Sequence, residues 1–597
     1  MQPYEEKTFT QYFMPYRELG VVKNASSDLL MNIEPEGNVS RLKIFATSAQ
    51  KDLHIVVMKG EKQVLDIIRD ITPETILEEW VPVDTLTGVR VSICNSKGKL
   101  LLSWEPEPNE IKEVPEPAKA ALDPKDIRTT EQLYLTGLHL EQYRHATYSA
   151  TDYYEEALSR DPDDVRNNNA MGLWLIRKGQ FAKAEPYLRR AVKTLTEKNP
   201  NPYDGEPLYN LGLSLKYQGK TDEAYDCFYK ACWNAAWQDA GYYSLAQLSA
   251  SKGNWEEALY EIDKSLLRNW HNLRGRHLKA VVLRHLGRVD EALALIRESL
   301  AIDRFNFGCS FEEYLLTGEK AVLDDLLVRM RSEGHNYEEL SLDYASAGCW
   351  EEALKVVEVA FEVVVSERTL LYYYKSWFLL SLDRLKEAEM AICVAEHQPA
   401  DCCFPNTLEA IMALQAVIRF ADVAPKAHYY LGNLWYDKRQ YPEAVAEWEK
   451  SVEQDDTFPT VLRNLSLAYF NKLNKQQEAV VLLERAFKLD IRDARILMEL
   501  DQLYKRLNRS HADRLDLLDK LKDVAFSRDD LYLEYVTLLN QLGRYEEAIR
   551  MIDARRFHPW EGGEGKVPAQ YQLARVELVK ACLKAGVNYL DTANYEP

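Results

Sequence analysis

Residues 219–224 read Gly-Lys-Thr-Asp-Glu-Ala, residues 253–258 read Gly-Asn-Trp-Glu-Glu-Ala, and residues 287–292 read Gly-Arg-Val-Asp-Glu-Ala. Successive glycines are 34 residues apart, and alanine follows each of them after five positions. The same spacing recurs at Gly179 and Ala184, Gly348 and Ala353, and Gly543 and Ala548, and copies without the glycine centre on Ala388, Ala444 and Ala479. Self-similarity at a fixed period of this length predicts an array of stacked helix pairs.

The repeating unit resembles the tetratricopeptide repeat, and the resemblance covers roughly residues 129–590. Its small and large residues are Leu211, Gly212, Gly219, Ala224, Phe228 and Ala231 in one copy, and Leu431, Gly432, Trp435, Ala444 and Trp448 in another. Small residues allow two helix backbones to approach where they cross, and large ones fill the adjoining gaps. We therefore predict a mainly α protein, an α-solenoid of about 11 repeats over residues 129–597 whose last repeat is incomplete. The spacing is irregular at 305–335, 395–424 and 505–530, where we expect kinks.

The first hundred residues have a different pattern. Short runs of alternating apolar and polar residues at 41–45, 54–58 and 89–93 are separated by turn sequences such as Lys59-Gly60-Glu61. This pattern predicts a small antiparallel β-sandwich domain over residues 1–105. Residues 106–128 then contain five prolines among acidic residues and alanines. Such a composition stiffens the chain without building a core, so we expect a linker there.

Charge and cysteine content exclude several classes of protein. The 597 residues include 74 Lys and Arg against 94 Asp and Glu, a formal net charge of -20, so nucleic acids and anionic membranes are not expected partners. Nine cysteines, an odd number, are spread along the chain, and the only close pair, Cys402 and Cys403, is adjacent. This indicates buried thiols in a reducing compartment. The first 20 residues lack the basic start and apolar run of a secretory signal, so we predict a cytoplasmic protein.

A closer resemblance rests on three strings that the generic repeat does not require, residues 199–207, 233–240 and 557–567. They are similar to a bacterial family in which a galactose-mutarotase-like "domain of unknown function 5107" precedes tetratricopeptide repeats. Residues 9–20 resemble the segment that follows the mutarotase-like domain in that family. The resemblance implies a carbohydrate-related setting, and it implies that the chain lacks the mutarotase-like domain or that the gene is split.

Motifs for enzyme chemistry are absent from the sequence. The glycine-rich residues 561–567 place two carboxylates where a phosphate would sit, and Val567 stands where a phosphate-binding loop has Ser or Thr. His-Glu-x-x-His, Gly-x-Ser-x-Gly and Cys-x-x-Cys do not occur. The sequence therefore gives no support for catalysis by this chain alone, and predicts neither a cofactor nor a metal site.

Two loops share the order proline, aromatic, acid, glycine, and a third segment contains two tryptophans. Their candidate ligand-binding residues are Tyr203, Asp204, Glu206, Trp233, Asn234, Trp237, Asp239, His558, Trp560, Glu561, Glu564 and Lys566. Aromatic faces beside carboxylates and amides suit a neutral glycan, and a catalytic carboxylate pair is a second interpretation. The third is structural: proline and glycine fix the turn, the aromatic ring fills a seam between repeats, and the acid caps the next helix.

The geometry of the repeat also predicts which side chains face the concave groove, namely Tyr209, Lys216, Tyr217, Tyr243, Gln247, His277 and Arg284 as well as Glu206. A long concave surface is the usual binding surface of a solenoid. We therefore expect a non-enzymatic scaffold that binds a protein or peptide in this groove. The alternative is an accessory half of a carbohydrate-active protein, with the loops near 203 and 560 holding a glycan or a mutarotase-like domain.

Overall fold

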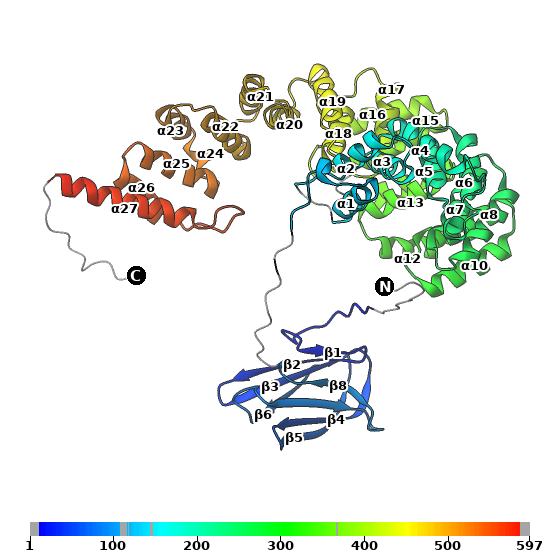
Figure 1. Ribbon diagram of the computed structural model, residues 1–597, viewed down its shortest axis with the longest axis horizontal. Helices are drawn as coiled ribbons and strands as arrows, with labels where there is room; N and C mark the ends of the chain where they lie inside the picture. Colours follow the sequence, from blue (N-terminus) through cyan, green and yellow to red (C-terminus); the bar gives the residue numbers. More distant parts are fainter. Residues whose placement is uncertain (1–10, 108–115, 117–118, 144–146, 366–367, 586–597) are drawn as a thin grey trace. The chain divides into compact units, whose positions relative to one another are not determined.

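The computed structural model describes residues 11–107, 116, 119–143, 147–365 and 368–585 (Figure 1). The chain forms two compact units, Met1–Ala120 and Ala121–Pro597. The first unit holds two antiparallel four-stranded sheets, in the order β1-β2-β3-β6 and β5-β4-β7-β8. The strands are β1 (Asn24–Ala25), β2 (Leu29–Glu36), β3 (Val39–Ala46), β4 (Gln50–Lys59), β5 (Lys62–Ile71), β6 (Leu77–Val81), β7 (Val89–Cys94) and β8 (Leu100–Trp104).

The predicted β-sandwich is confirmed by the core of the first unit. The three alternating runs of the sequence lie on β3, β4 and β7, and their alternate residues, such as Ile44, Ile55 and Ile93, are fully buried. Side chains of a strand point to opposite faces in turn, so each run contributes one apolar face to a shared core.

The C-terminal end of the segment expected to be a linker, 106–128, lies in the second unit. The second unit begins at Ala121, and residues 124–126 form a short 3-10 turn whose carbonyl groups accept hydrogen bonds from Arg160. Tyr153 donates a hydrogen bond to the Leu122 carbonyl at 3.0 Å. The residues after Ala120 are therefore packed on the helical unit, and most of the preceding proline-rich segment, 108–115 and 117–118, lies outside the described residues.

The second unit is helical. Its first half consists of α1 (Thr130–Gln142), α2 (Ala150–Arg160), α3 (Val165–Arg177), α4 (Phe181–Thr196), α5 (Glu206–Tyr217), α6 (Thr221–Ala231), α7 (Gln238–Ser251), α8 (Trp255–Arg268), α9 (Leu273–His285), α10 (Val289–Ile302), α11 (Phe307–Thr317), α12 (Lys320–Met330), α13 (Gly334–Ser346) and α14 (Trp350–Val363). The second half consists of α15 (Thr369–Ser381), α16 (Leu385–His397), α17 (Leu408–Phe420), α18 (Pro425–Asp437), α19 (Tyr441–Gln454), α20 (Pro459–Asn471), α21 (Gln476–Leu489), α22 (Ala494–Arg506), α23 (His511–Lys520), α24 (Lys522–Ala525), α25 (Asp529–Gln541), α26 (Tyr545–Asp553) and α27 (Lys566–Lys584).

Successive helices pack as antiparallel pairs, and the small residues of the repeat lie where the two helices of a pair cross. A Cβ atom added at Gly212 would lie 2.6 Å from the Phe228 ring, and one at Gly432 would lie 2.5 Å from the Trp448 ring. Ala224 and Ala444 are fully buried beside them. The predicted α-solenoid is thus confirmed, because each pair closes only where a residue without a bulky side chain meets a large ring.

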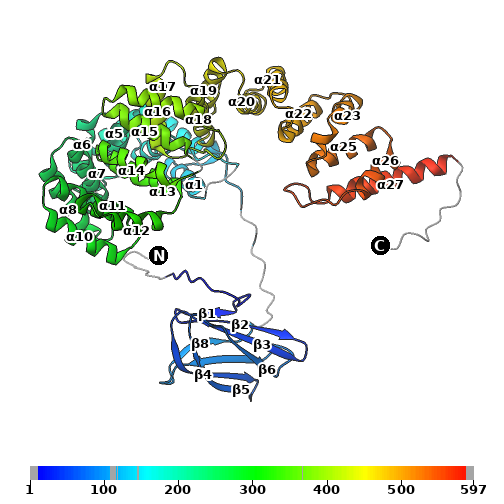
Figure 2. The ribbon, with the colours of Figure 1, turned by 180° about the vertical axis from the view of Figure 1, so that it is seen from behind.

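The helices from α1 to α19 wind until the two ends of this segment meet, whereas α20 to α27 extend away from it (Figures 1 and 2). The turn between α3 and α4 lies against α17, α18 and α19. Gly179 contacts Ile411 and Trp435 so closely that an added Cβ would lie 2.4 and 3.0 Å from their side chains. Gln180 and Lys183 both donate to Glu443 Oε1, at 2.9 and 2.7 Å. These contacts join residues more than 200 positions apart in the sequence.

Irregular elements occur where the spacing of the repeat departs from its period. Among the described residues, α17 lacks an antiparallel second helix and packs against α15 and α18 instead. Near the end of the chain, the segment after α22 is broken into α23 and the four-residue α24. The last helix, α27, has its apolar residues Val576, Val579 and Leu583 exposed at 51, 38 and 55%, and Leu578 is half-buried. Residues 586–597 lie outside the described residues.

The contact of the α3–α4 turn with α17 predicts that alanine substitutions at two glycines with the same backbone conformation differ in their effect on stability. Gly179 and Gly219 both have φ of 75°, but an added Cβ at Gly219 meets nothing within 4 Å. Both alanine substitutions place a side chain in the left-handed region, at a cost of about 1–3 kcal/mol. Only Gly179→Ala also overpacks the contact with Ile411, which adds about 1–3 kcal/mol.

We therefore expect a lower melting temperature for Gly179→Ala than for Gly219→Ala, measured by circular dichroism on the full chain. Equal melting temperatures would show that the contact between the α3–α4 turn and α17 does not contribute to stability.

Candidate functional site

The side chains predicted to face the concave groove lie on α5, α7 and α9, the first helices of three successive pairs. Lys216 Nζ donates to Gln247 Oε1 at 2.7 Å, and Gln247 Nε2 donates to Ser346 Oγ of α13, also at 2.7 Å. Tyr217 donates to Glu409 Oε1 of α17 at 3.1 Å. The inner surface of α5 and α7 is therefore bonded to helices that follow much later in the chain.

The inner residues of α9 have similar partners. Arg284 Nε donates to Glu312 Oε2 of α11 at 2.7 Å, and its Nη2 donates to Glu352 Oε1 of α14 at 2.8 Å. His277 is 4% exposed, and its ring meets the Tyr344 ring edge to face, with centroids 4.7 Å apart. A guanidinium held by two carboxylates in this way is fixed in position. The groove side of α9 is thus bonded to later helices at Arg284, whereas beside His277 a hollow of about 260 Å³ is lined by residues of α9, α11 and α13 and of the loop before α11.

Two further groove candidates, Tyr209 and Tyr243, are half-buried. Tyr209 stacks on Trp237, with ring centroids 4.8 Å apart. Burial is the main cause that raises the pKa of Tyr243 above its usual value. Burial also lowers the pKa of Lys216 from 10.5 to about 8, although the Glu409 carboxylate nearby acts in the opposite direction. An ammonium group at Lys216 is therefore destabilised by its surroundings.

The loop before α5 is organised mainly by its own backbone. Asp204 Oδ1 accepts from the Glu206 amide at 2.9 Å, which is a capping interaction at the start of the helix. Glu206 Oε1 accepts from Asn169 of the preceding repeat at 2.9 Å. Tyr203 is 95% exposed. Two of the three candidate residues thus have partners within the protein, whereas the tyrosine ring faces solvent.

The segment between α6 and α7 is also built by local bonds. Asn234 accepts from the Ala236 amide at 2.8 Å. Asp239 accepts from Ser265 and Asn269 at 2.8 and 2.9 Å, which fixes the turn that follows α8. Trp233 is 58% exposed and lies beneath the Lys230 ammonium, 3.8 Å from the ring centroid. The geometry of this segment matches the structural interpretation of its polar residues.

The loop between α26 and α27 contains the last group of candidates. Trp560 is half-buried and covers Gly563, where an added Cβ would lie 2.4 Å from the indole. His558 is anchored to Asp529, which accepts from its backbone amide at 2.8 Å. Glu561, Glu564 and Lys566 are exposed. A hollow of about 230 Å³ lies beside Trp560 and is lined by Phe557, His558, Pro559, Trp560, Gly563, Glu564, Val567 and Pro568.

A second hollow, of about 190 Å³, lies between α20 and α22, beyond the region in which the turns of the solenoid meet. It is lined by Ser466, Leu467, Phe470, Asn471, Leu483, Met498, Glu499, Gln502, Leu503 and Arg506. Ser466 and Asp501 occupy the same repeat position as Gly212 in α5. Leu467 and Gln502 directly follow them. These residues are not among the candidates predicted from the sequence, although the phase of the repeat is sufficient to locate them. We refer to this hollow as the α20–α22 groove.

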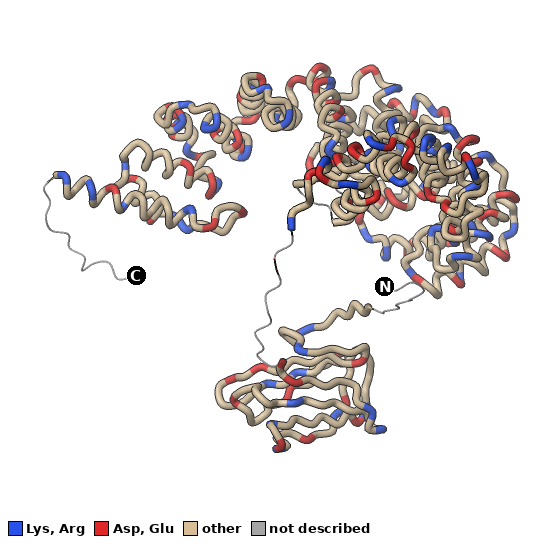
Figure 3. Tube along the Cα trace, viewed as in Figure 1, with Lys and Arg blue, Asp and Glu red and all other residues tan. Residues whose placement is uncertain are grey.

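The α20–α22 groove combines an apolar floor with polar edges. Leu467, Phe470 and Met498 are half-buried, and the Arg506 guanidinium lies 5.5 Å from the centroid of the Phe470 ring. Asn471 and Arg506 are exposed. Acidic and basic residues are interspersed along the helices (Figure 3). The groove therefore offers apolar contact, amide hydrogen bonds and one cation within a small area.

Comparison with family models matches two segments of the chain. Residues 24–104, which hold β1 to β8, match the second domain of YphG-like proteins. Residues 406–458, which hold α17, α18 and α19, match a tetratricopeptide repeat model. The helical unit is built of tetratricopeptide repeats. Neither description refers to a mutarotase-like domain or to a carbohydrate.

Comparison with curated proteins finds human tetratricopeptide repeat protein 7A, 34% identical over 99 residues. The match covers 17% of this chain and only 11% of that protein. The chain thus spans about a tenth of the length of this relative.

Solved structures of low identity also match. One is Naa15/Naa10 bound to HypK-THB, at 12% identity and a TM-score of 0.25 over 76% of this chain and 73% of that one. Another is a tetratricopeptide repeat protein from Parabacteroides merdae, at 15% identity and a TM-score of 0.23 over 53% of this chain and 98% of that one. The assignment of the fold rests on the helix pairs themselves. Within the described residues, no helix combines the length and apolar character needed to cross a bilayer.

The burial of Lys216 predicts a pH dependence of stability. The unfolded chain holds this proton up to a pKa of 10.5, whereas the folded chain releases it near pH 8. The penalty of burying the ammonium is complete below pH 8 and is relieved as the pH rises. Lys216→Met removes the penalty, so the free energy of unfolding of the variant exceeds that of the parent at pH 7, and the difference narrows by on the order of 1–2 kcal/mol by pH 10.

Urea unfolding at pH 7 and pH 10 measures this difference. Lys386→Met, which replaces an exposed lysine of α16, is the control and shows no such narrowing. A pH-independent difference for Lys216→Met would mean that Lys216 is not destabilised as an ammonium.

Trp560 and Trp233 provide a second test, because the two tryptophans lie in candidate loops but differ in burial. Trp560 packs against the core of the last repeats, whereas Trp233 is 58% exposed. We expect Trp560→Ala to lower stability by about 1–3 kcal/mol, and Trp233→Ala by less than about 1 kcal/mol. Thermal unfolding of both variants measures the difference. An unchanged stability for Trp560→Ala would contradict a packing role and leave the ring available for a ligand.

Proposed function

We propose that this protein is a non-enzymatic scaffold that binds a peptide segment of a partner protein in the α20–α22 groove. Tetratricopeptide solenoids expose a long concave surface, and binding is the usual function of such a surface. The observation that carries the proposal is a contrast within the chain. Inner residues of α5, α7 and α9 bond to later helices, whereas the corresponding surface of α20 and α22 is an accessible hollow.

The chemistry of the groove indicates the kind of segment that it accepts. The half-buried Leu467, Phe470 and Met498 form an apolar floor that fits an aliphatic or aromatic side chain. Met is well suited to such contacts because its flexible thioether adapts to the shape of a partner. Arg506 at one edge suits a carboxylate, and Asn471 and Gln502 suit backbone amides. We therefore infer a peptide in which an apolar residue is followed closely by an acidic group.

The interior of the first superhelical turn is less suited to binding a partner. Several of its polar side chains are already paired, so a partner would have to break bonds such as that between Tyr217 and Glu409. Breaking a buried hydrogen bond without replacing it costs about 1–3 kcal/mol. A partner that binds in the α20–α22 groove meets no such cost at Asn471 and Arg506, because these side chains are exposed.

The more specific predictions from the sequence stay proposals. They are a mutarotase-like domain or a neutral glycan as partner, a bacterial origin and a cytoplasmic location. The hollow beside Trp560 is the one place on the described surface that we associate with a glycan. Because part of the Trp560 ring packs on Gly563, less of it is left for a sugar than an exposed platform would offer.

Site-specific photo-crosslinking in the native host tests the proposed groove. A photoreactive residue replaces Gln502 inside the groove, and a matched variant carries it at Val481, a 64% exposed position on the second helix of the neighbouring pair, α21. We expect a discrete protein adduct from position 502 and none from position 481. The same adducts from both positions would indicate non-specific contact and contradict the proposal.

The cross-linked peptide, once identified by mass spectrometry, then allows a quantitative prediction. Arg506→Ala removes the only cation among the residues that line the groove. It weakens binding of that peptide by about 5–30-fold, equivalent to about 1–2 kcal/mol. Isothermal titration calorimetry measures the affinity, and Arg485→Ala on α21, outside the groove, is the control. An affinity that does not change in Arg506→Ala would exclude a carboxylate at this edge.

A further inference from the structure

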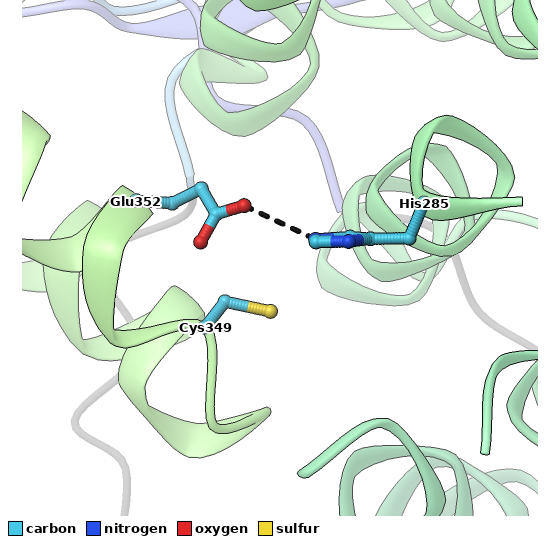
Figure 4. A group of neighbouring side chains, drawn as sticks. All are labelled: His285, Cys349 and Glu352. Carbon is cyan, nitrogen blue, oxygen red and sulfur yellow. Dashed lines mark hydrogen bonds and ion pairs between the residues drawn. The ribbon is translucent and has the colours of Figure 1, made fainter. Parts of the chain in front are cut away.

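His285 meets Cys349 and Glu352, which follow it by more than 60 positions in the sequence, beside the α13–α14 turn. His285 is the last residue of α9, Cys349 immediately precedes α14, and Glu352 lies in the first turn of α14. The His285 Nε2 atom lies 3.1 Å from Glu352 Oε1, and one nitrogen, sulfur or oxygen atom of each residue lies within 4.8 Å of the others. Figure 4 shows the imidazole and the carboxylate directed toward each other, with the thiol pointing into the space between them.

The surrounding residues hold these side chains in place. The Trp255 ring stacks on the His285 imidazole, with centroids 4.0 Å apart and planes 4° from parallel. Cys349 is only 5% exposed, and its backbone amide donates to the Tyr344 carbonyl at 3.1 Å. The turn that carries it lies tightly against α7, since a Cβ added at Gly348 would lie 2.7 Å from Ser251 Cα. The three side chains are therefore preorganised.

A hollow of about 260 Å³ opens beside the cluster. All three side chains line it, together with Trp255 and residues from the end of α7 and from the α13–α14 turn. The cluster is thus reachable by a small ion or a water molecule, although the sulfur is largely shielded from solvent.

Apart from His285, whose imidazole lies 3.1 Å from Glu352, the cluster has one guanidinium for two carboxylates. Arg284 is shared between Glu312 and Glu352, at 2.7 and 2.8 Å. Glu312 is fully buried, and the Glu352 side chain is 14% exposed. One positive and two negative charges sum to a net charge of about -1 in a place of low solvent access, which is unfavourable unless a cation compensates it.

One of the distances between ligand atoms matches a tetrahedral metal centre. Zinc bonds to imidazole nitrogen and carboxylate oxygen are about 2.0–2.2 Å long, so two such ligands stand about 3.3 Å apart in a tetrahedron. The observed nitrogen-to-oxygen distance is 3.1 Å. A set of one nitrogen, one sulfur and one oxygen ligand suits zinc, and disfavours Mg²⁺ and Ca²⁺, which prefer oxygen alone.

We propose that His285, Cys349 and Glu352 bind a zinc ion, with water in the fourth position. Binding requires the Cys349 thiol to lose its proton to solvent and its sulfur to move toward the other two ligands, because the three ligand atoms now lie within 4.8 Å of one another rather than at bonding separations. Arg284 Nη2 lies 2.8 Å from Glu352 Oε1 and 3.5 Å from His285 Nε2, so binding also requires this end of the guanidinium to move away from the two ligand atoms, while its Nε stays bonded to Glu312. The ion would join α9 to α14 and so fasten two repeats that are not neighbours in the sequence.

Metal titration of the full chain tests this site. The protein is freed of metal with a chelator, and its affinity for Zn²⁺ is measured by competition with a chromophoric chelator. Co²⁺ serves as a spectroscopic probe, because a cobalt–thiolate bond gives a charge-transfer band in the near ultraviolet. We expect about one Zn²⁺ per chain and a cobalt–thiolate band.

Variants then separate this site from other cysteines of the chain. Cys349→Ser removes the cobalt–thiolate band and weakens zinc binding at least about tenfold, and His285→Asn weakens it similarly. Cys309→Ser, which alters another buried cysteine, leaves both unchanged. Circular dichroism checks that each variant is folded. If Cys349→Ser does not fold, His285→Asn alone tests the site. Absence of stoichiometric zinc binding, or binding that survives both ligand substitutions, would overturn the proposal.

Discussion

The close approach of helices at small residues is the constraint on which the rest of this structure depends. Where Gly432 meets Trp448 or Gly212 meets Phe228, a single added methyl group would lie within 3 Å of a ring. Each pair is therefore locked in one crossing geometry, and each pair repeats it with a small rotation relative to the last. The curvature of the whole solenoid is the sum of these rotations, so a local packing rule determines which distant residues meet.

The accumulated rotation of the helix pairs explains why the segment from α1 to α19 differs from the segment from α20 to α27. From α1 to α19 the rotations bring the α3–α4 turn back against α17 and α18, and Gly179 permits the contact because it has no side chain. Once the turns meet, the inner side chains find partners on later helices, and Lys216, Gln247 and Arg284 become part of the packing. Beyond α19 no second turn covers the inner surface of the described residues, and the α20–α22 groove stays accessible.

The sequence predicted the repeats, their crossing residues and the β-sandwich, because these features depend on contacts between residues that are close in the chain. The 34-residue period alone predicts the positions of α5 to α10. It did not predict that Tyr217 would meet Glu409, since this contact depends on rotations accumulated over many repeats. For the same reason His285 and Cys349, 64 positions apart, gave no metal-binding motif. In the candidate loops near 203 and 560, Asp204, Glu206 and His558 bond within the protein, whereas Glu561, Glu564 and Lys566 are exposed.

The polar interior of the first turn has a structural consequence of its own. Apolar side chains would let two superhelical turns slide against each other at little cost, whereas a directional bond is made only in one register. Arg284, held between Glu312 and Glu352, and Gln247, bonded to Ser346, each satisfy their partners in a single alignment of α9 or α7 with α13 and α14. The burial of the Lys216 ammonium is unfavourable in itself, but its hydrogen bond to Gln247 belongs to the same set of polar contacts. We infer that these polar contacts define how the turns align, and that the apolar crossings within each pair supply most of the stability.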